Sequence, residues 1–129
     1  MKKAEILLVD DEAVFVTNMS RLLKTRGYGV TAASDGSQAL EALRQKSYDV
    51  MVLDLKMPVM SGIETLRQVK RLPVSTEVLL LTAHGTMDTA FEAIEMGAFD
   101  YVTKPCEIGD LVTKIEAAHA RKRARENRE

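Results

Sequence analysis

Carboxylates, a hydroxyl and a lysine stand at the ends of four short apolar runs in this 129-residue chain. These chain positions are Asp10-Asp11, Asp54, Thr82 and Lys104. If the four runs are parallel strands of one sheet, their polar ends meet at the edge where α/β sheets bind ligands. Two carboxylates at about 4 Å repel by on the order of 4 kcal/mol at an effective dielectric of about 20.

Positive charge must offset this repulsion, and the sequence suggests two sources. Lys104 stands at the same predicted edge as the carboxylates. A hard divalent cation would supply the rest, and oxygen ligands that leave room for water suit Mg²⁺. Apart from His84, the predicted edge carries no imidazole or thiolate ligand, which argues against zinc.

A carboxylate beside a metal ion, a lysine and a hydroxyl is suited to phosphoryl transfer. Asp54 would act as the nucleophile and form an aspartyl phosphate. Mg²⁺ and Lys104 would neutralise charge on the phosphoryl oxygens, and the Thr82 hydroxyl would donate a hydrogen bond to one of them.

The elements that must position these residues alternate along the chain. Short apolar runs predict strands near residues 6–9, 28–33, 50–54, 78–81 and 99–103. Amphipathic stretches between and after them predict five helices, with Gly27 and Gly97 ending two of them and Ser61 beginning another. This alternation predicts an α/β fold, a parallel five-stranded sheet with helices on both faces.

Helical spacing also predicts which side chains face the core. In the first helix these are Phe15, Met19, Leu22 and Leu23, and in the fourth they are Met87, Ala90, Phe91 and Ile94.

Composition favours a single globular domain. The chain is 46% hydrophobic and 29% charged, and its formal net charge is −1, which gives no overall attraction to nucleic acid or membrane. Residues 121–129 carry +3 of this charge, so residues 1–120 carry −4. The single cysteine, Cys106, and the absence of a signal-peptide pattern fit a cytoplasmic protein.

Taken together, the motifs resemble a receiver domain of bacterial two-component response regulators. The matching residues are Asp10-Asp11, Asp54 with Pro58 and Gly62 beyond it, Thr82-Ala83, and Lys104-Pro105 with Tyr101 before it. The resemblance spans residues 4–120. The segments around residues 82–85 and 97–101 look most like receivers of enhancer-binding, AAA+-type transcription regulators.

The resemblance implies a fold and roles for the site residues. The fold would be the flavodoxin-like (βα)5 three-layer sandwich with strand order 2-1-3-4-5. Asp11, Asp54 and the backbone carbonyl of Lys56 would bind Mg²⁺ directly, and Asp10 would act through water. Thr82 and Tyr101 would form the switch pair. The Lys104-Pro105 bond would be cis.

Several side chains keep a second interpretation. Lys56 and His84 either modulate the lifetime of the phosphate or are solvated loop residues. Tyr101 could be a packing aromatic, and Cys106 is interpreted as a small buried hydrophobe.

Two other functional classes are alternatives to a signalling receiver. A haloacid-dehalogenase-like phosphatase normally has a second aspartate two residues after its nucleophile, and Lys56 stands there, so this class is rejected. The other class is a degenerate receiver that serves only as a scaffold. The complete acid cluster speaks against it, because the carboxylates repel one another and a scaffold has no use for them.

The prediction is therefore a signalling switch and not a conventional enzyme. A receiver domain over residues 1–120 accepts phosphate from a sensor histidine kinase, and residues 121–129 form a basic helical extension or linker toward an effector domain. A homodimer could form through the fourth helix, fifth strand and fifth helix, where Asp100, Lys114 and Arg121 offer opposite charges. Neither membrane binding nor direct nucleic-acid binding is expected of this domain.

Overall fold

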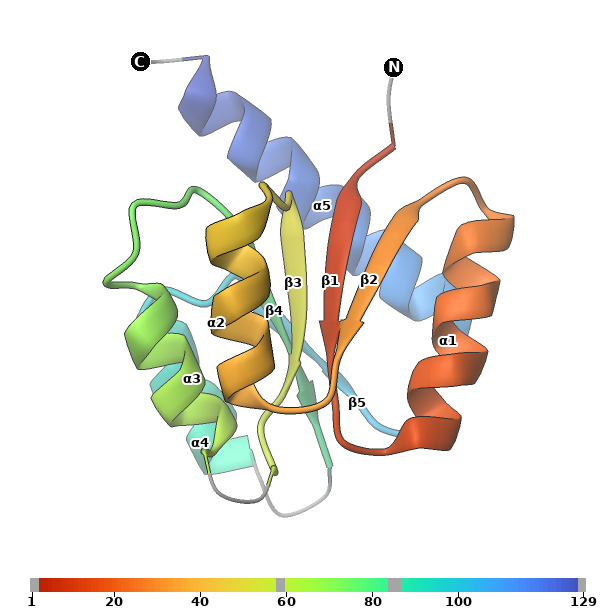
Figure 1. The fold of residues 1–129 in the computed structure, drawn as a ribbon, viewed down its shortest axis with the longest axis horizontal. Coiled ribbons are helices and arrows are strands. Elements are labelled where there is room, and N and C mark those ends of the chain that lie inside the picture. Colours follow the sequence, from red (N-terminus) through yellow and green to blue (C-terminus); the bar gives the residue numbers. More distant parts are fainter. Residues whose placement is uncertain (1–2, 58–59, 84–86, 128–129) are drawn as a thin grey trace.

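A computed structural model describes residues 3–57, 60–83 and 87–127 of the chain. The strands are β1 (Glu5–Val9), β2 (Gly29–Ala33), β3 (Val50–Asp54), β4 (Glu77–Thr82) and β5 (Asp100–Thr103). The helices are α1 (Ala13–Thr25), α2 (Gly36–Gln45), α3 (Gly62–Val69), α4 (Met87–Glu95) and α5 (Ile108–Glu126). Strands and helices alternate from one end of the chain to the other, as the sequence predicts (Figure 1).

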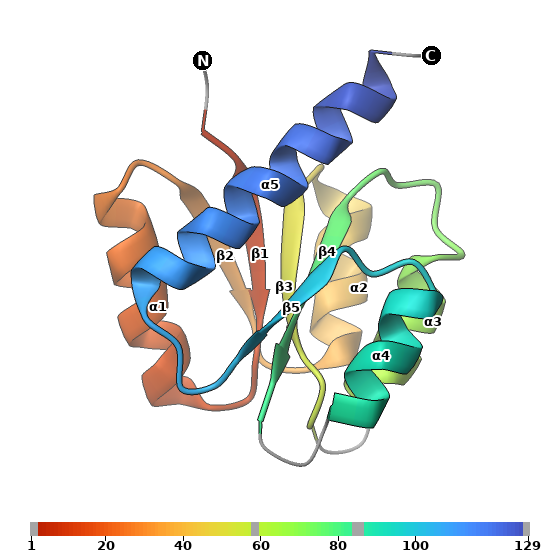
Figure 2. The ribbon, with the colours of Figure 1, turned by 180° about the vertical axis from the view of Figure 1, so that it is seen from behind.

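The five strands form one parallel sheet in the order β2-β1-β3-β4-β5. Helices α2, α3 and α4 cover one face of the sheet, and α1 and α5 cover the other (Figures 1 and 2). This arrangement is the three-layer, flavodoxin-like fold with the predicted strand order. The site must therefore lie where the strand order reverses, beyond the carboxyl ends of β1 and β3.

The central strand β3 shows why the sheet is stable. Its side chains alternate between the two faces, with Met51 and Leu53 in the core beneath α2 and α3, and Val50 and Val52 in the core beneath α5. All four are fully buried. Burial of such side chains contributes about 1.5–3 kcal/mol each, so the strand that ends in Asp54 is firmly held.

Side-chain caps begin two of the helices on the first face of the sheet. Asp35 accepts a hydrogen bond from the Gln38 N–H at 2.8 Å and starts α2. Ser61 accepts one from the Glu64 N–H at 3.2 Å and starts α3, as its spacing from Glu64 predicts. These caps satisfy N–H groups that have no partner within the helix.

Two apolar residues expected in the core are exposed instead. Phe91 is 53% exposed and Leu22 is 42% exposed. In α4 the small side chains of Ala90 and Ala93 take the fully buried positions, so that the helix lies close to the sheet and the Phe91 ring is left at its flank. The inward orientation predicted for these two side chains is wrong.

Helix α5 continues without a break past residue 120, so the predicted domain boundary falls inside a helix. Its last turns contact the amino-terminal ends of the strands, at the opposite end of the sheet from Asp54. The Arg121 guanidinium donates to both carboxylate oxygens of Glu77, at 2.7 and 2.8 Å, and Lys122 lies 3.1 Å from Asp49. Within the described residues, no helix has both the length and the apolar content needed to cross a bilayer.

Candidate functional site

The ends of β1 and β3 bring two of the predicted carboxylates together. Val9 and Leu53 are register partners in the sheet, and Asp10 and Asp54 follow them directly. Both acids are buried, with 1% of Asp10 and 5% of Asp54 exposed to solvent. A backbone hydrogen bond from the Asp10 N–H to the Ala33 carbonyl, at 3.1 Å, fixes the turn after β1.

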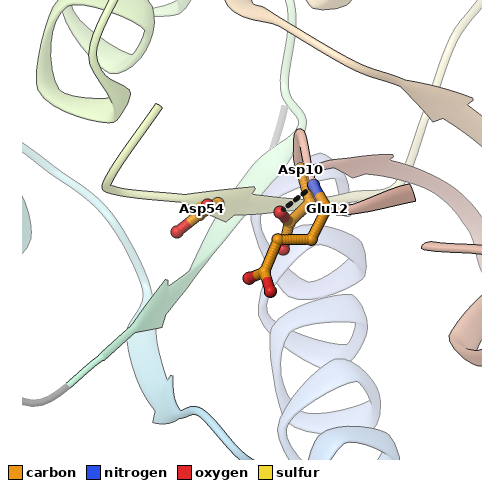
Figure 3. Close-up of side chains that lie close together, drawn as sticks. All are labelled: Asp10, Glu12 and Asp54. Atoms are coloured by element: carbon orange, nitrogen blue, oxygen red, sulfur yellow. Dashed lines mark hydrogen bonds between the residues drawn. The ribbon is translucent and has the colours of Figure 1, made fainter. Parts of the chain in front are cut away.

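A third carboxylate, that of Glu12, completes the cluster. One oxygen from each of Asp10, Glu12 and Asp54 lies within 4.8 Å of the others, and Figure 3 shows the three side chains grouped at the strand ends. The Glu12 N–H donates to Asp10 Oδ1 at 3.0 Å, the dashed line in that view. The sequence pattern did not identify Glu12 as a site residue, although it is the third acid of the run that follows β1.

Asp11, the acid predicted to bind metal directly, also lies at this site. Its side chain is exposed and lines the site cavity of about 800 Å³, together with Asp54, Lys56 and Lys104. It does not belong to the three-carboxylate cluster of the described residues. Asp11 therefore borders the same cavity as Asp54.

Lys104 supplies the predicted positive charge from the end of β5. Its ammonium lies 2.6 Å from Asp10 Oδ2, contacts Glu12 Oε1, and lies 4.5 Å from the centre of the Phe15 ring. Although burial opposes its charge, the contacts with Asp10 and Glu12 raise the pKa of the Lys104 ammonium. The Lys104-Pro105 peptide bond is cis, the isomer that the resemblance implied.

The electrostatic environment of Asp54 disfavours its ionised form. Burial and the nearby Asp10 carboxylate raise the pKa of Asp54 to about 6, against the hydrogen bond from Lys56 and the charge of Lys104. Burial is the largest of these effects. The carboxylate is therefore ionised near neutral pH but lacks full compensation, and a cation bound beside it would stabilise the charged form.

The loop after β3 holds the backbone close to Asp54. The Lys56 N–H donates to Asp54 Oδ1 at 3.2 Å, and the Lys56 side chain is exposed. The Gly62 N–H donates to the Leu55 carbonyl at 3.1 Å, and a Cβ on Gly62 would lie 2.6 Å from the Asp54 carbonyl oxygen. Only glycine permits this approach, so α3 begins directly against the end of β3.

Thr82 ends β4, the strand next to β3, and Tyr101 stands on β5, one strand further along the sheet. Thr82 is fully buried, and its hydroxyl contacts the Ala83 carbonyl at 3.3 Å. The Tyr101 ring is partly buried against the core and meets Phe91 edge to face. Pro58 and His84, which the sequence pattern predicts near this site, lie outside the described residues.

The oxygen ligands of this site fit a hard divalent cation. Asp10, Glu12 and Asp54 supply carboxylate oxygens, and burial together with the Asp10 carboxylate disfavours the ionised form of Asp54 by raising its pKa. No sulfur or imidazole group belongs to this cluster of described residues, so its chemistry suits Mg²⁺ better than zinc. The cluster could thus hold a metal ion beside a nucleophilic carboxylate.

These features are consistent with a phosphoacceptor site on a flavodoxin-like fold, and the comparisons with known proteins agree. Residues 6–116 match the response regulator receiver domain family, so the chain belongs to that family. It is a receiver domain, which is a signalling switch and not a conventional enzyme.

Individual relatives point to regulators of transcription. The chain is 40% identical over 126 residues to the transcriptional regulatory protein ZraR of Klebsiella oxytoca, covering 98% of this chain and 28% of ZraR. It is 36% identical over 118 residues to the DNA-binding transcriptional regulator NtrC of Escherichia coli, covering 92% and 25%. A response regulator receiver domain protein from Clostridium thermocellum superposes with a TM-score of 0.89 at 37% identity, covering 95% and 98% of the two chains.

The chain therefore spans only about a quarter of the length of these two curated relatives. The activities of the rest of each relative are properties of that relative and not of this chain. The class predicted from the motifs, a receiver related to transcription regulators, is confirmed by the family match and by these relatives.

Proposed function

We propose that Asp54 accepts a phosphoryl group from the phosphohistidine of a sensor histidine kinase in a Mg²⁺-dependent reaction. The observation that carries the proposal is the buried Asp54 carboxylate at the end of β3, grouped with Asp10 and Glu12 and facing Lys104 across the cavity. Two buried carboxylates that share one lysine destabilise the fold, and phosphoryl transfer gives this arrangement a use.

The reaction forms one bond and breaks another at phosphorus. An Asp54 Oδ atom attacks the phosphorus, and the bond from phosphorus to the donor atom breaks with its electron pair remaining on the donor. With acetyl phosphate as donor the leaving group is acetate. Water later hydrolyses the aspartyl phosphate and returns the carboxylate.

The residues around Asp54 have separate roles in this proposal. Asp11, Asp54 and the Lys56 carbonyl would hold Mg²⁺ directly, with Asp10 acting through water. Such a cation, when bound, offsets charge on the phosphoryl oxygens. The Lys104 ammonium pairs with one of those oxygens, and the Thr82 hydroxyl donates a hydrogen bond to another.

The output follows from the same residues. When the Thr82 hydroxyl turns toward the phosphoryl group it leaves space that the Tyr101 ring can fill, so the face of α4, β5 and α5 changes. This face would contact an effector domain, an output protein or a second copy of the chain, and through them would control transcription in the cytoplasm. Phosphorylation would bias an active state that already exists at low population.

Intact-mass measurement after incubation with Mg²⁺ and acetyl phosphate tests the acceptor. The wild-type chain should gain one phosphoryl group, and Asp54→Asn should gain none. Asp110→Asn removes an exposed carboxylate in the first turn of α5 and should be labelled like wild type. Equal labelling of Asp54→Asn, or labelling of wild type in excess chelator, would contradict the proposal.

A further inference from the structure

The neighbours of the Lys104 ammonium are set in the unphosphorylated chain. In the described residues its hydrogen bonds go to Asp10 and Glu12, and the ring of Phe15 lies against its remaining side. Only 12% of the Lys104 side chain is exposed. The ammonium is therefore already coordinated before any phosphoryl group arrives, and its hydrogen-bond partners do not include the Asp54 carboxylate.

We propose that Glu12 is a positioning residue that holds Lys104 in a resting contact, which must break when the ammonium pairs with the phosphoryl group. This inference rests on the proposed function of Asp54. Glu12 acts through Lys104 and needs no contact with the reacting atoms. On phosphorylation, a phosphoryl oxygen replaces the Glu12 carboxylate as a partner of the Lys104 ammonium.

Glu12 is the partner that can be exchanged, because the two acids differ in burial. The Asp10 side chain is fully buried, and its second oxygen accepts the Glu12 N–H, so its position is fixed. The Glu12 side chain is 63% exposed, and water can solvate its carboxylate once Lys104 leaves. Loss of the Glu12 contact therefore costs little, whereas loss of the Asp10 contact would leave a buried charge without its partner.

The Glu12 side chain is not needed to cap helix α1. It stands at the first position before α1 but makes no capping hydrogen bond there. Its backbone N–H and carbonyl hold the turn and the first helical bond, and both remain when the side chain is changed. Glu12→Gln should therefore keep the fold while removing the charge that attracts Lys104.

The test is the rate of phosphorylation at saturating Mg²⁺, followed by intact mass with acetyl phosphate. A contact made in the resting state and lost in the transition state slows the reaction. Glu12→Gln should therefore be phosphorylated faster than wild type, by about two- to fivefold, since exposed ion pairs are weak. Glu41→Gln removes an exposed carboxylate on α2 and should react at the wild-type rate.

A double-mutant cycle separates this role from simple repulsion of the anionic donor. In a Lys104→Met background, followed over hours because it reacts slowly, Glu12→Gln should give no acceleration. An undiminished acceleration in that background would show that Glu12 acts by repulsion and would overturn the inference. An unchanged rate for Glu12→Gln in the wild-type background would overturn it as well.

Mg²⁺ affinity, measured by titration calorimetry, completes the test. Glu12→Gln should bind Mg²⁺ within about twofold of wild type, because the groups proposed to hold Mg²⁺ directly are Asp11, Asp54 and the Lys56 carbonyl, while the Glu12 carboxylate pairs with Lys104. A loss of affinity without acceleration at saturating Mg²⁺ would make Glu12 a cation ligand instead. If wild type itself gains no phosphoryl group, or gains it equally as Asp54→Asn, the proposed function fails rather than the role of Glu12.

Discussion

The rings of Phe91 and Tyr101 meet edge to face, with their centroids 6.4 Å apart and their planes at 83°. Such pairs contribute about 0.5–1.5 kcal/mol beyond area burial. Phe91 is half-exposed on α4 and Tyr101 stands on β5, so the pair links the two elements of the proposed output face. Movement of the Tyr101 ring must alter the surface that Phe91 presents.

From this relationship we predict a monomer–dimer balance that phosphorylation shifts through α4, β5 and α5. Sedimentation should show a larger dimer fraction with Mg²⁺ and acetyl phosphate than without them. Tyr101→Ala and Asp100→Lys should shrink the difference. Val14→Ala changes an exposed side chain on α1 and should leave it intact. If Val14→Ala is the variant that reduces the dimer, the interface lies on α1 and the prediction is wrong.

The charges on this face are less available than the sequence suggests. Lys114 pairs with Asp100 within the chain, and Arg121, expected to reach across the same face, pairs with Glu77 instead. A dimer would have to exchange the Lys114–Asp100 pair for an intermolecular one. Charge reversal at Asp100 therefore tests both the internal pair and the interface.

A second prediction concerns the pH dependence of stability. The pKa of Asp54 rises from 3.8 to about 6 on folding, so the folded chain binds the proton more tightly than the unfolded chain. Ionised Asp54 thus destabilises the fold at neutral pH, and this cost disappears as the pH falls through about 6 toward 4. Asp54→Asn should be more stable than wild type by about 1–3 kcal/mol at neutral pH in chelator.

Urea unfolding at several pH values measures this difference. The advantage of Asp54→Asn should decrease as the pH is lowered, and Mg²⁺ should reduce it at neutral pH by binding the wild-type site. Asp110→Asn serves as the control and should show no such dependence. A constant advantage across the pH range would mean that the charge of Asp54 is not its source.

A third prediction concerns the buried Glu77 carboxylate at the amino-terminal end of β4. Arg121 binds both of its oxygens, and Arg125 lies 3.4 Å from one of them. Arg121→Ala should lower the free energy of unfolding by about 1–2 kcal/mol, less than for a fully buried pair, because Arg121 is partly exposed and Arg125 remains. Arg44→Ala removes a pair exposed on both sides and should cost little. Equal losses in the two variants would contradict the role given to Glu77.

A fourth prediction concerns Tyr28, whose hydroxyl donates to Glu116 on α5. Burial and the Glu116 carboxylate raise the pKa of Tyr28 to about 12. Because the unfolded value is 10.0, the stability that the neutral phenol contributes is complete below about pH 10 and is lost as the pH rises through 12. Tyr28→Phe should cost about 0.5–1.5 kcal/mol at neutral pH.

Ultraviolet titration of the folded chain checks the Tyr28 assignment. The chain has three tyrosines, and a phenolate that forms about two pH units late should be missing from Tyr28→Phe. Persistence of the late phase in that variant would assign it to another tyrosine.

The sequence was sufficient for the sheet and for the convergence of polar side chains at the carboxyl ends of its strands. The run Val50–Asp54 reads as a central strand because both faces are apolar, and the polar strand ends then converge by topology alone. The role of Glu12 could not be read in this way, since it depends on a short turn in which the Glu12 N–H binds Asp10. That turn brings the carboxylate toward Lys104, and the only signal in the sequence is a third acid in the run.

The errors have a common physical cause. Periodicity reports which residues share a face but not how closely a helix approaches the sheet, so it could not show that Ala90 and Ala93 would displace Phe91. Likewise the apolar run predicted a strand only from Val78, yet Glu77 is the first residue of β4 and fully buried. A buried carboxylate requires a cation, and the basic end of α5 supplies it.

The contacts at the end of α5 also limit how the most basic stretch of the chain can behave toward polyanions. Arg121, Lys122 and Arg125 each lie within 4 Å of an internal carboxylate oxygen, and Arg125 also donates to the Ser75 carbonyl. A polyanion gains affinity when free cations replace its condensed counterions. Here each of the three cations would first have to leave Glu77 or Asp49. The stretch should therefore release few counterions, and any residual nucleic-acid binding should show a shallow dependence on salt.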